Sequence, residues 1–88
     1  MNFEILYHPD VPDKDLSRLS HDVKRRVRKS IESKLAHAPQ EFGEPLRRTL
    51  KGYWKLRVGD YRVIYKIQGK EVIVLRIGHR RDVYGRDS

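Results

Sequence analysis

The chain has 88 residues and a net charge of +8, from 20 lysines and arginines against 12 acidic side chains, and this length predicts one domain spanning residues 1–88. It contains no cysteine, which excludes disulfide scaffolds, thiolate zinc sites and cysteine nucleophiles and fits a reducing cytosol. No apolar run approaches the roughly 20 residues of a membrane span, and the first residues lack a signal-peptide pattern, so we expect a cytoplasmic protein without membrane contact.

The first half of the chain predicts a strand followed by two helices. Alternating side chains from Asn2 to Tyr7 indicate a strand, which the prolines that follow bring to an end. A first helix is expected to begin at Pro12, and Ser20 is the expected N-cap of a second. We expect Pro39 to end this second helix. Its apolar face holds residues that recur at every fourth position: Val23, Val27, Ile31 and Leu35.

The second helix also carries a basic run, which consists of Arg25, Arg26, Arg28 and Lys29. These side chains fall largely outside the apolar arc, and Asp22 and Glu32 offset their charge. We interpret the run as a solvent-exposed face, with contact to RNA as the alternative.

Three strands are expected after a loop over residues 40–45. The segments are rich in β-branched and aromatic side chains, and short loops that contain glycine separate them, as is typical of antiparallel hairpins. Their expected bounds are Tyr53–Val58, Tyr61–Ile67 and Glu71–Ile77. The predicted fold class is therefore α+β, in the order β-α-α-β-β-β, with a helical hairpin packed on one face of an antiparallel sheet.

The two-residue turn that begins at Gly59 fixes the register of the first hairpin. It places Val58 opposite Tyr61 and Arg57 opposite Arg62, and side chains then alternate between the two faces. The core face holds Trp54, Leu56, Val58, Tyr61, Val63 and Tyr65. The other face, called the basic face below, holds Tyr53, Lys55, Arg57, Arg62, Ile64 and Lys66.

Four cations therefore converge on the basic face, and no carboxylate is expected beside them. Like charges directly opposite in a sheet, such as Arg57 and Arg62, are destabilising, which favours a bound anion as the reason for the arrangement. The alternative is that the long side chains extend into water and cover Ile64. Residues 45–88 hold twelve basic and four acidic side chains, against eight of each in residues 1–44, and a basic half is typical of polyanion-binding proteins.

The third strand allows two registers. A three-residue loop before it places Ile73, Leu75 and Ile77 with the core and Arg76 on the basic face, whereas a two-residue loop reverses this arrangement. We prefer the three-residue loop because it pairs apolar side chains with apolar side chains.

The segment after the third strand adds a candidate for proton transfer. Gly78 permits a sharp turn, which would return His79, Arg80 and Tyr84 to the basic face. Imidazole is the side chain best suited to acid or base chemistry near neutral pH. No spacing of histidines and carboxylates is typical of a metal site, so we expect neither metal nor cofactor. Clustered cations suit a phosphodiester, and RNA can be cleaved without metal by its own 2′-hydroxyl.

Two segments resemble the RelE/ParE superfamily of type II toxins: Leu-Arg-Val-Gly-Asp-Tyr-Arg-Val-Ile-Tyr (56–65) and Val-Ile-Val-Leu-Arg-Ile-Gly-His-Arg-Arg-Asp-Val-Tyr (72–84). The order of strand, helical hairpin and three-stranded meander matches as well, so the resemblance covers essentially the whole chain. The RelE branch implies a ribosome-dependent mRNA endonuclease that cuts the A-site codon by metal-independent 2′-hydroxyl attack. It also implies a cognate antitoxin encoded alongside, through whose complex the toxin would reach operator DNA.

The resemblance also implies a set of site residues. The chemistry of these residues suggests their roles: Lys55 and Arg62 would neutralise the phosphate, and Arg80 would support the leaving-group side. Tyr84 would stack on or orient a base. Tyr53 stands where some members carry a second lysine. The catalytic candidates, with His79 as general acid or base, are Lys55, Arg62, His79, Arg80 and Tyr84. The RNA-binding candidates are Tyr53, Arg57, Lys66, Arg76 and Arg81.

Two alternatives remain beside the endonuclease. One is a ParE-like, non-enzymatic poison of DNA gyrase on the same scaffold, and the other is a catalytically degenerate basic module that binds RNA or an antitoxin. The retained Lys55, Arg62, Arg80 and Tyr84 favour the endonuclease, because a gyrase binder has no evident need for this set. We expect an acidic antitoxin segment to pack on the helical hairpin or to cover the basic face.

Overall fold

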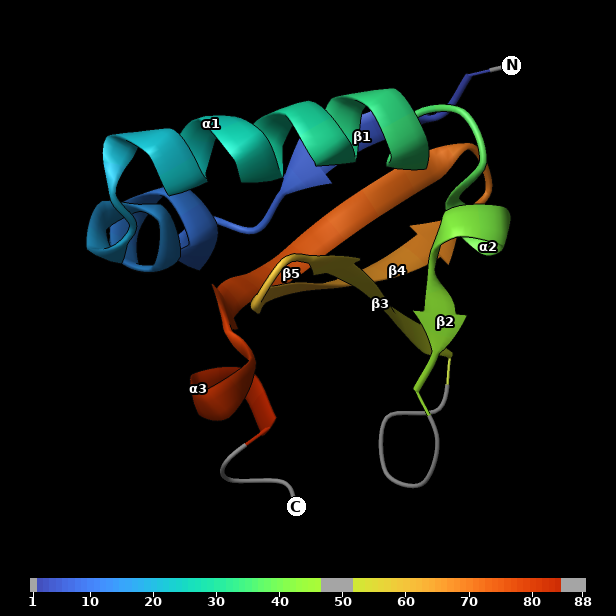
Figure 1. Ribbon diagram of the computed structural model, residues 1–88. Helices are drawn as coiled ribbons and strands as arrows, with labels where there is room; N and C mark the ends of the chain where they lie inside the picture. Colours follow the sequence, from blue (N-terminus) through green and yellow to red (C-terminus); the bar gives the residue numbers. More distant parts are fainter. Residues whose placement is uncertain (1, 47–51, 85–88) are drawn as a thin grey trace.

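A sheet of five strands in the order β1-β5-β4-β3-β2 forms the centre of the molecule (Figure 1). The computed structural model describes residues 2–46 and 52–84, with Tyr84 described by its backbone alone. The meander β3-β4-β5 is antiparallel, and β1 adds to β5 in parallel through a helical crossover. The α+β fold class and the element order are confirmed. The strands are β1 (Glu4–Tyr7), β2 (Glu44–Pro45), β3 (Tyr53–Val58), β4 (Tyr61–Gln68) and β5 (Glu71–His79).

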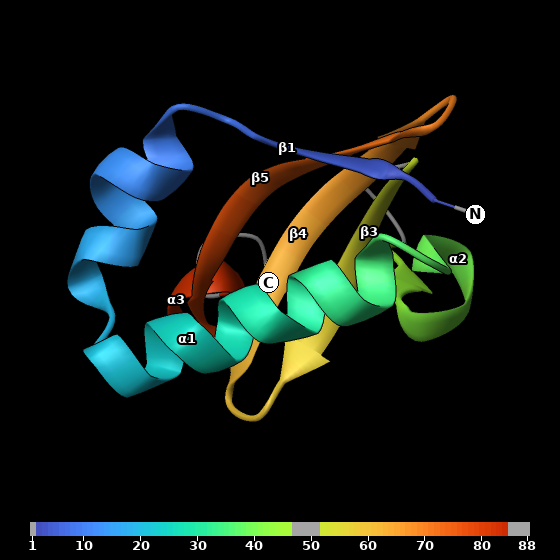
Figure 2. The same cartoon turned by 90° about the horizontal axis from the view of Figure 1, so that it is seen from above.

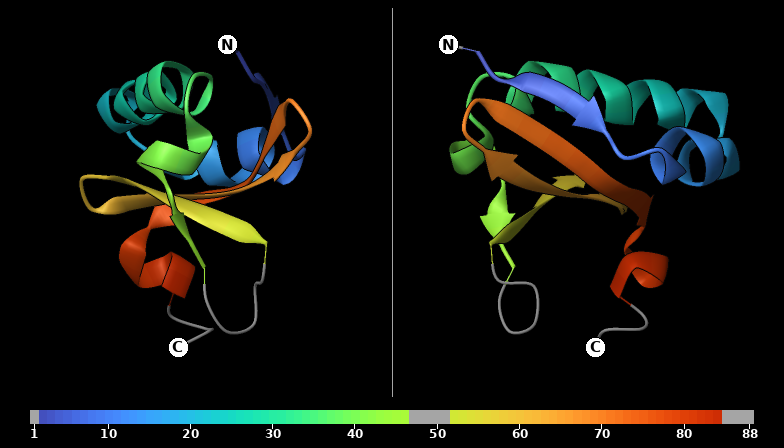
Figure 3. Two further views of the ribbon diagram at one scale, coloured as in Figure 1. Left: turned by 90° about the vertical axis from the view of Figure 1, so that its right-hand side faces the viewer. Right: turned by 180° about the vertical axis from the view of Figure 1, so that it is seen from behind.

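The longest helical segment crosses one face of this sheet, and a short C-terminal helix lies against the other. Seen from above, α1 and its continuation η3 run across β4 and β3 (Figure 2), and α3 lies beneath the sheet (Figure 3). Ser20 caps α1 as predicted, since its Oγ accepts a hydrogen bond from the backbone N–H of Val23 at 3.3 Å. The helical elements are η1 (Val11–Asp15), η2 (Leu16–Arg18), α1 (His21–Ser30), η3 (Ile31–Leu35), α2 (Pro39–Phe42) and α3 (Arg80–Tyr84).

The hydrophobic core lies between α1–η3 and the sheet. The predicted apolar face of the helix forms the side of the core nearest α1–η3, and its Val27, Ile31 and Leu35 are fully buried. Full burial of such a side chain contributes about 1.5–3 kcal/mol, so this face is what holds α1 on the sheet. The register of β3 and β4 is the one that the sequence predicts. The core-facing residues of these strands form the side of the core nearest the sheet: Leu56, Val58, Val63 and Tyr65.

The turn between β4 and β5 differs from the preferred prediction. It contains two residues, because Gln68 pairs with Glu71. Val72 and Val74 therefore face the core in the first half of β5, where the preferred register had placed Ile73. This part of the prediction is wrong, because apolar side chains on both faces of β5 left the register underdetermined.

A bulge at Leu75 then reverses the alternation along β5. Ile64 pairs with Arg76, which leaves Leu75 as the extra residue between two regular stretches of pairing. Beyond the bulge, Ile77 lies in the core and Arg76 is exposed on the opposite face, as predicted. Neither register considered from the sequence includes this irregularity.

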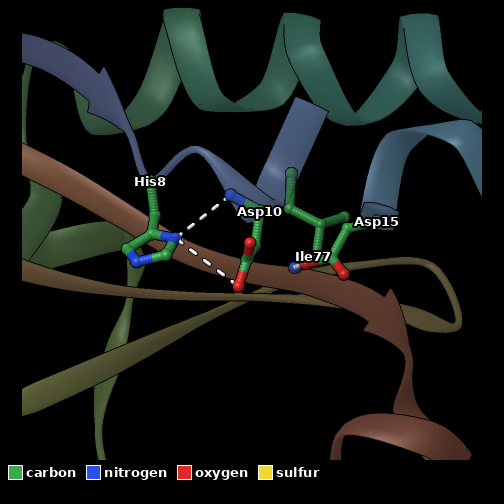
Figure 4. A network of polar contacts seen from close by, with 4 residues as sticks. All are labelled: His8, Asp10, Asp15 and Ile77. Atoms are coloured by element: carbon green, nitrogen blue, oxygen red, sulfur yellow. Dashed lines mark hydrogen bonds and ion pairs between the residues drawn. The ribbon is translucent and has the colours of Figure 1, made fainter. Parts of the chain in front are cut away.

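Asp15 covers the part of β5 that lies beyond the end of β1 (Figure 4). The pairing of β1 ends at Val74, and farther along the strand Asp15 Oδ2 accepts a hydrogen bond from the backbone N–H of Ile77 at 2.8 Å. A carboxylate thus satisfies an edge amide that would otherwise need water. Upstream, Nδ1 of His8 accepts from the N–H of Asp10 at 3.1 Å, at the turn into η1.

The segment expected to be a loop, residues 40–45, contains part of a one-turn helix and a short strand. Pro39 does not end the long helix but begins α2, since proline suits a first helical position. The Tyr65 hydroxyl donates to the Pro39 carbonyl oxygen at 2.6 Å and holds α2 on the sheet. Burial raises the pKa of the Tyr65 phenol. A side chain at Gly43 would collide with this hydroxyl, so glycine is required there.

Candidate nucleic-acid interface

The basic face carries cations from all three strands of the meander. The pairing of these strands sets its side chains in three rows that run across them. From the β3–β4 turn outward, the rows are Arg57–Arg62–Gly78, Lys55–Ile64–Arg76 and Tyr53–Lys66–Ile73. The predicted lysines and arginines of β3, β4 and β5 therefore share one face, with Tyr53 at the end farthest from the turn.

Arg62 is buried, whereas the sequence predicted that it would lie in an exposed cluster of cations. It is 7% exposed, and its Nη1 donates to the carbonyl oxygens of Gly59 at 2.8 Å and Tyr61 at 2.9 Å. These bonds offset the repulsion with Arg57 within the protein, so the pairing of the two arginines does not require a bound anion. The Arg62 Nε is buried too and has no hydrogen-bond partner among the described residues. An unpaired buried N–H costs free energy, and a functional role is one explanation for keeping it.

Lys55 has a carboxylate beside it, contrary to the prediction. The short strand β2 pairs Glu44 with Lys55, and Glu44 Oε1 lies 3.7 Å from Lys55 Nζ. Sequence reasoning missed this neighbour because it treated the segment as loop. The Glu44 side chain is 58% exposed, and exposed ion pairs contribute only about 0–1 kcal/mol. The Lys55 side chain is less exposed, at 23%, and Glu44 offsets part of the positive charge of its row.

His79 lies on the helical side of the sheet instead of the basic face. It ends β5 opposite Tyr61, and the two rings meet edge to face with their centroids 5.4 Å apart. Gly78 lies within β5, where a Cβ would approach Cγ2 of Val83 to 3.1 Å, so glycine makes room for α3. The prediction that a turn at Gly78 returns His79 to the basic face is wrong. Its Nδ1 accepts from the N–H of the exposed Arg81 at 3.1 Å, which places the proton of a neutral ring on Nε2.

The β3–β4 turn gathers arginines from three elements. Arg57 and Arg62 flank the turn, and the backbone N–H of Arg80 donates to the carbonyl oxygen of Asp60 at 2.8 Å. This bond fixes the start of α3 beside the turn, on the side of the sheet that carries the basic face (Figure 3). We call Arg57, Arg62 and Arg80 the turn cluster. Tyr84 ends α3, and its side chain lies outside the described part of the chain.

A small hollow of about 120 Å³ opens beside His79, between η2 and α3. Its charged lining is mixed, since Arg18 and Arg76 stand with Asp15 and Asp82. Two carboxylates beside two guanidinium groups give no net attraction for a phosphate. The surroundings of His79 thus differ from those of the turn cluster.

Neither a metal centre nor a membrane segment emerges from residues 2–46 and 52–84. No group of three or more histidines and carboxylates among them could hold a metal ion. Within the same ranges, no helix is long and apolar enough to cross a membrane. The donors that the basic face offers are guanidinium and ammonium groups, which bind phosphate through charge-assisted hydrogen bonds.

Three acidic residues that shape this region were missed from the sequence, and none carries a usable signal. Glu44 belongs to a strand of two residues, which is too short for an alternating pattern. Asp15 reaches an amide 62 positions farther along the chain. Asp60 acts through its backbone carbonyl, which every residue type possesses.

Comparison with known proteins decides the family. The family model described as the ParE toxin of the type II toxin-antitoxin system parDE matches residues 5–84. Toxin RelG of Mycobacterium tuberculosis is 36% identical over 75 residues, which cover 83% of this chain and 86% of that protein. The chain belongs to the RelE/ParE superfamily of type II toxins. Toxin RelE of the same organism is 33% identical over 73 residues, 81% of this toxin and 75% of that protein.

Solved structures place the toxin in the RelE branch. The crystal structure of the toxin-antitoxin complex RelBE2 from Mycobacterium tuberculosis matches with a TM-score of 0.84 at 29% identity, covering 91% of this toxin and 93% of that chain. A mutant of the Escherichia coli toxin RelE in the free state shares the fold, with a TM-score of 0.71 at 19% identity over 97% of this toxin and 93% of that chain. The resemblance drawn from the sequence is confirmed.

Proposed function

We propose that this toxin is a ribosome-dependent endonuclease that cleaves mRNA in the A site without a metal ion. The observation that supports the proposal most is the turn cluster, in which the backbone brings Arg57, Arg62 and Arg80 to one turn beside a cation-bearing sheet face. A phosphodiester at this turn would lie near three arginines, and a reaction that accumulates negative charge requires such positive charge. The similarity to the toxins RelE and RelG supports the choice of this branch of the superfamily.

The reaction requires the 2′-oxygen to bond to phosphorus while the bond from phosphorus to the 5′-oxygen breaks. The products are a 2′,3′-cyclic phosphate and a 5′-hydroxyl, with one proton leaving the 2′-hydroxyl and one reaching the departing oxygen. Negative charge grows on the phosphoryl oxygens in between, and fixed donors stabilise it. Arg62 suits this role because two carbonyls hold its positively charged guanidinium in place at the turn.

The other predicted site residues keep narrower roles in this proposal. Lys55 adds a second positive charge in the next row, and Arg80 supports the leaving group from the start of α3. Tyr84 stacks on or orients a base, as aromatic side chains do with unstacked RNA. We assign no proton transfer to His79, because its ring packs against Tyr61 on the helical side.

We further propose that the partner is a cognate antitoxin. Relatives have been solved with one, as in the complexes RelBE2 from Mycobacterium tuberculosis and RelE-RelB from Pyrococcus horikoshii. The charge of +8 makes an acidic antitoxin segment the complementary ligand, on the helical hairpin or the basic face. Operator DNA would be bound only through that complex, and an mRNA substrate would place the toxin in the cytoplasm.

The description of the family model as a ParE toxin supports one alternative, a non-enzymatic poison of DNA gyrase. Induced expression with two readouts, primer extension on mRNA and gyrase-dependent DNA breaks, separates the two functions. We expect mRNA cut at A-site codons, a loss of about a hundredfold in cleavage for Arg80→Ala, and no change for the exposed α1 control Arg25→Ala. Intact mRNA together with accumulating DNA breaks would refute the endonuclease and support the gyrase poison.

A further inference from the structure

A second positive site lies on the other side of the β3–β4 turn. A groove of about 390 Å³ opens between α1–η3 and this turn, and we call it the α1 groove. Among the described residues its lining contains no carboxylate, and the lining residues whose side chains carry donors are Arg26, Lys29, Lys34, Arg57, Ser30 and Ser33. In Figure 2 the β3–β4 turn emerges from beneath α1, which is where these elements meet.

The cations of the α1 groove are held near one another without acidic partners in the described chain. Neither of the ion pairs found among the described residues involves any of the four. Arg26 Nη2 lies 3.1 Å from the point where a Cβ on Gly59 would sit, so this guanidinium packs over the turn. Lys34 Nζ lies 5.8 Å from the centre of the Phe42 ring. Such a concentration of like charge attracts an anion from solution.

The structure divides the basic run of α1 that the sequence presented as one exposed face. Arg26 and Lys29 line the groove, whereas Arg25 and Arg28 do not. The Arg25 Nη2 instead lies 3.2 Å from Nε2 of His21 on the same helix. The division supplies two pairs of exposed cations that differ in position and not in charge.

The α1 groove is continuous with the basic face through Arg57. The pairing of β2 with β3 covers Trp54 and Lys55 and ends there, so Arg57 lies on a stretch of β3 beyond that pairing. Arg57 belongs to the first row of the basic face and is also one of the residues that line the groove. Positive charge therefore continues around the edge of the sheet from the turn cluster to α1.

We propose that the α1 groove binds the sugar-phosphate backbone of an RNA strand that flanks the segment on the basic face, an inference that rests on the proposed function. Cations together with hydroxyl donors match phosphate oxygens. An acidic peptide fits less well, because the apolar part of the lining is Val58, which is 8% exposed and gives no pocket for an anchoring side chain. No aromatic ring from residues 2–46 or 52–84 lines the groove, so the contact reads the backbone and is independent of base sequence.

The test compares Arg26→Gln/Lys29→Gln with the matched control Arg25→Gln/Arg28→Gln. Each double variant removes two exposed charges from the same helix, so both should fold like the wild type. The probe is a twelve-nucleotide RNA with 2′-O-methyl groups throughout, which keeps its phosphates and cannot undergo 2′-hydroxyl attack. Binding of oligo-U and oligo-A probes is followed by fluorescence anisotropy over a salt series, with an oligo-glutamate peptide as competitor.

We expect the groove variant to bind both probes about tenfold more weakly. The slope of log affinity against log salt should become less steep by about 1.4, because each of the two lost phosphate contacts to a single strand removes about 0.7 from it. The control should change affinity by less than about twofold. Equal losses in the two variants, or a loss confined to the glutamate peptide, would overturn the proposal.

Cleavage of ribosome-bound mRNA by the same proteins separates this inference from the proposed function. If both variants cleave mRNA like the wild type and bind RNA with equal affinity, the proposal for the α1 groove is rejected and the proposed endonuclease function stands. Groove-dependent RNA binding without any cleavage would reject the endonuclease and leave the groove as an RNA-binding site.

Discussion

Arg62 is predicted to serve both cleavage and folding, and Arg62→Ala separates the two contributions. The substitution removes the buried guanidinium together with its bonds to the carbonyl oxygens of Gly59 and Tyr61. Cleavage should fall because the reacting phosphate loses a fixed donor, and stability should fall because the β3–β4 turn loses its internal brace.

The loss of stability can be estimated from the surroundings of the side chain. Hydrogen bonds from a charged donor contribute about 1.5–3 kcal/mol each. Gly59 is exposed and Tyr61 is half-buried, so water replaces part of what is lost, and removing the unpaired Nε recovers a further part. We expect the free energy of unfolding to fall by about 2 kcal/mol. A chain of 88 residues has about 4–13 kcal/mol, so Arg62→Ala should remain more than about 90% folded.

The assay pairs urea unfolding, followed by circular dichroism, with cleavage of ribosome-bound mRNA at the same temperature. We expect a loss of about a hundredfold or more in cleavage rate, far beyond the small unfolded fraction. Arg62→Lys keeps the charge and loses the planar fork, so it should recover part of the stability and little of the activity. Cleavage within threefold of wild type by folded Arg62→Ala would refute the catalytic role and leave Arg62 as a brace of the turn.

Two further predictions concern stability. Asp15→Ala should lower the free energy of unfolding by about 1–3 kcal/mol and speed hydrogen exchange at the Ile77 amide. The charge-matched control is Asp13→Ala, because Asp13 is exposed. Equal effects of the two substitutions would contradict the role of the Asp15 carboxylate at the edge of β5. For Tyr65, the raised pKa means that the folded state keeps a proton that the unfolded state loses above about pH 10, so wild-type stability should fall by about 1.4 kcal/mol per further pH unit. Tyr65→Phe should be less stable than the wild type at neutral pH. Urea titrations should show that the difference in free energy of unfolding between the two proteins becomes smaller above pH 10. A difference that stays constant with pH would contradict the prediction.

Much of the basic face could be predicted because one short turn determined it. A two-residue connection at Gly59 left a single register for β3 and β4, and strict alternation then separated Leu56 and Val63 from Lys55 and Arg62. The buried face of the long helix could be predicted equally well, because apolar residues at every fourth position lie on one face of a helix.

The remaining features depend on contacts that alternation does not encode. Apolar side chains occupy both faces of β5, so no pattern located the bulge at Leu75. The position of His79 followed from that bulge and from the role of Gly78 in admitting Val83. Whether Arg62 extends into water or folds onto its own turn is a choice between rotamers, which residue type alone does not decide.

The parallel pairing of β1 with β5 has a consequence for how the toxin is made. Glu4 pairs with Glu71, so β1 stays unpaired until β5 has been made, whereas β5 already has β4 as its other neighbour. Contacts of such sequence separation form late and slowly, because a long loop must close before they contribute. The β1 edge of the sheet is therefore completed last, and the newly made toxin passes through an interval in which β5 is open to pairing with another protein.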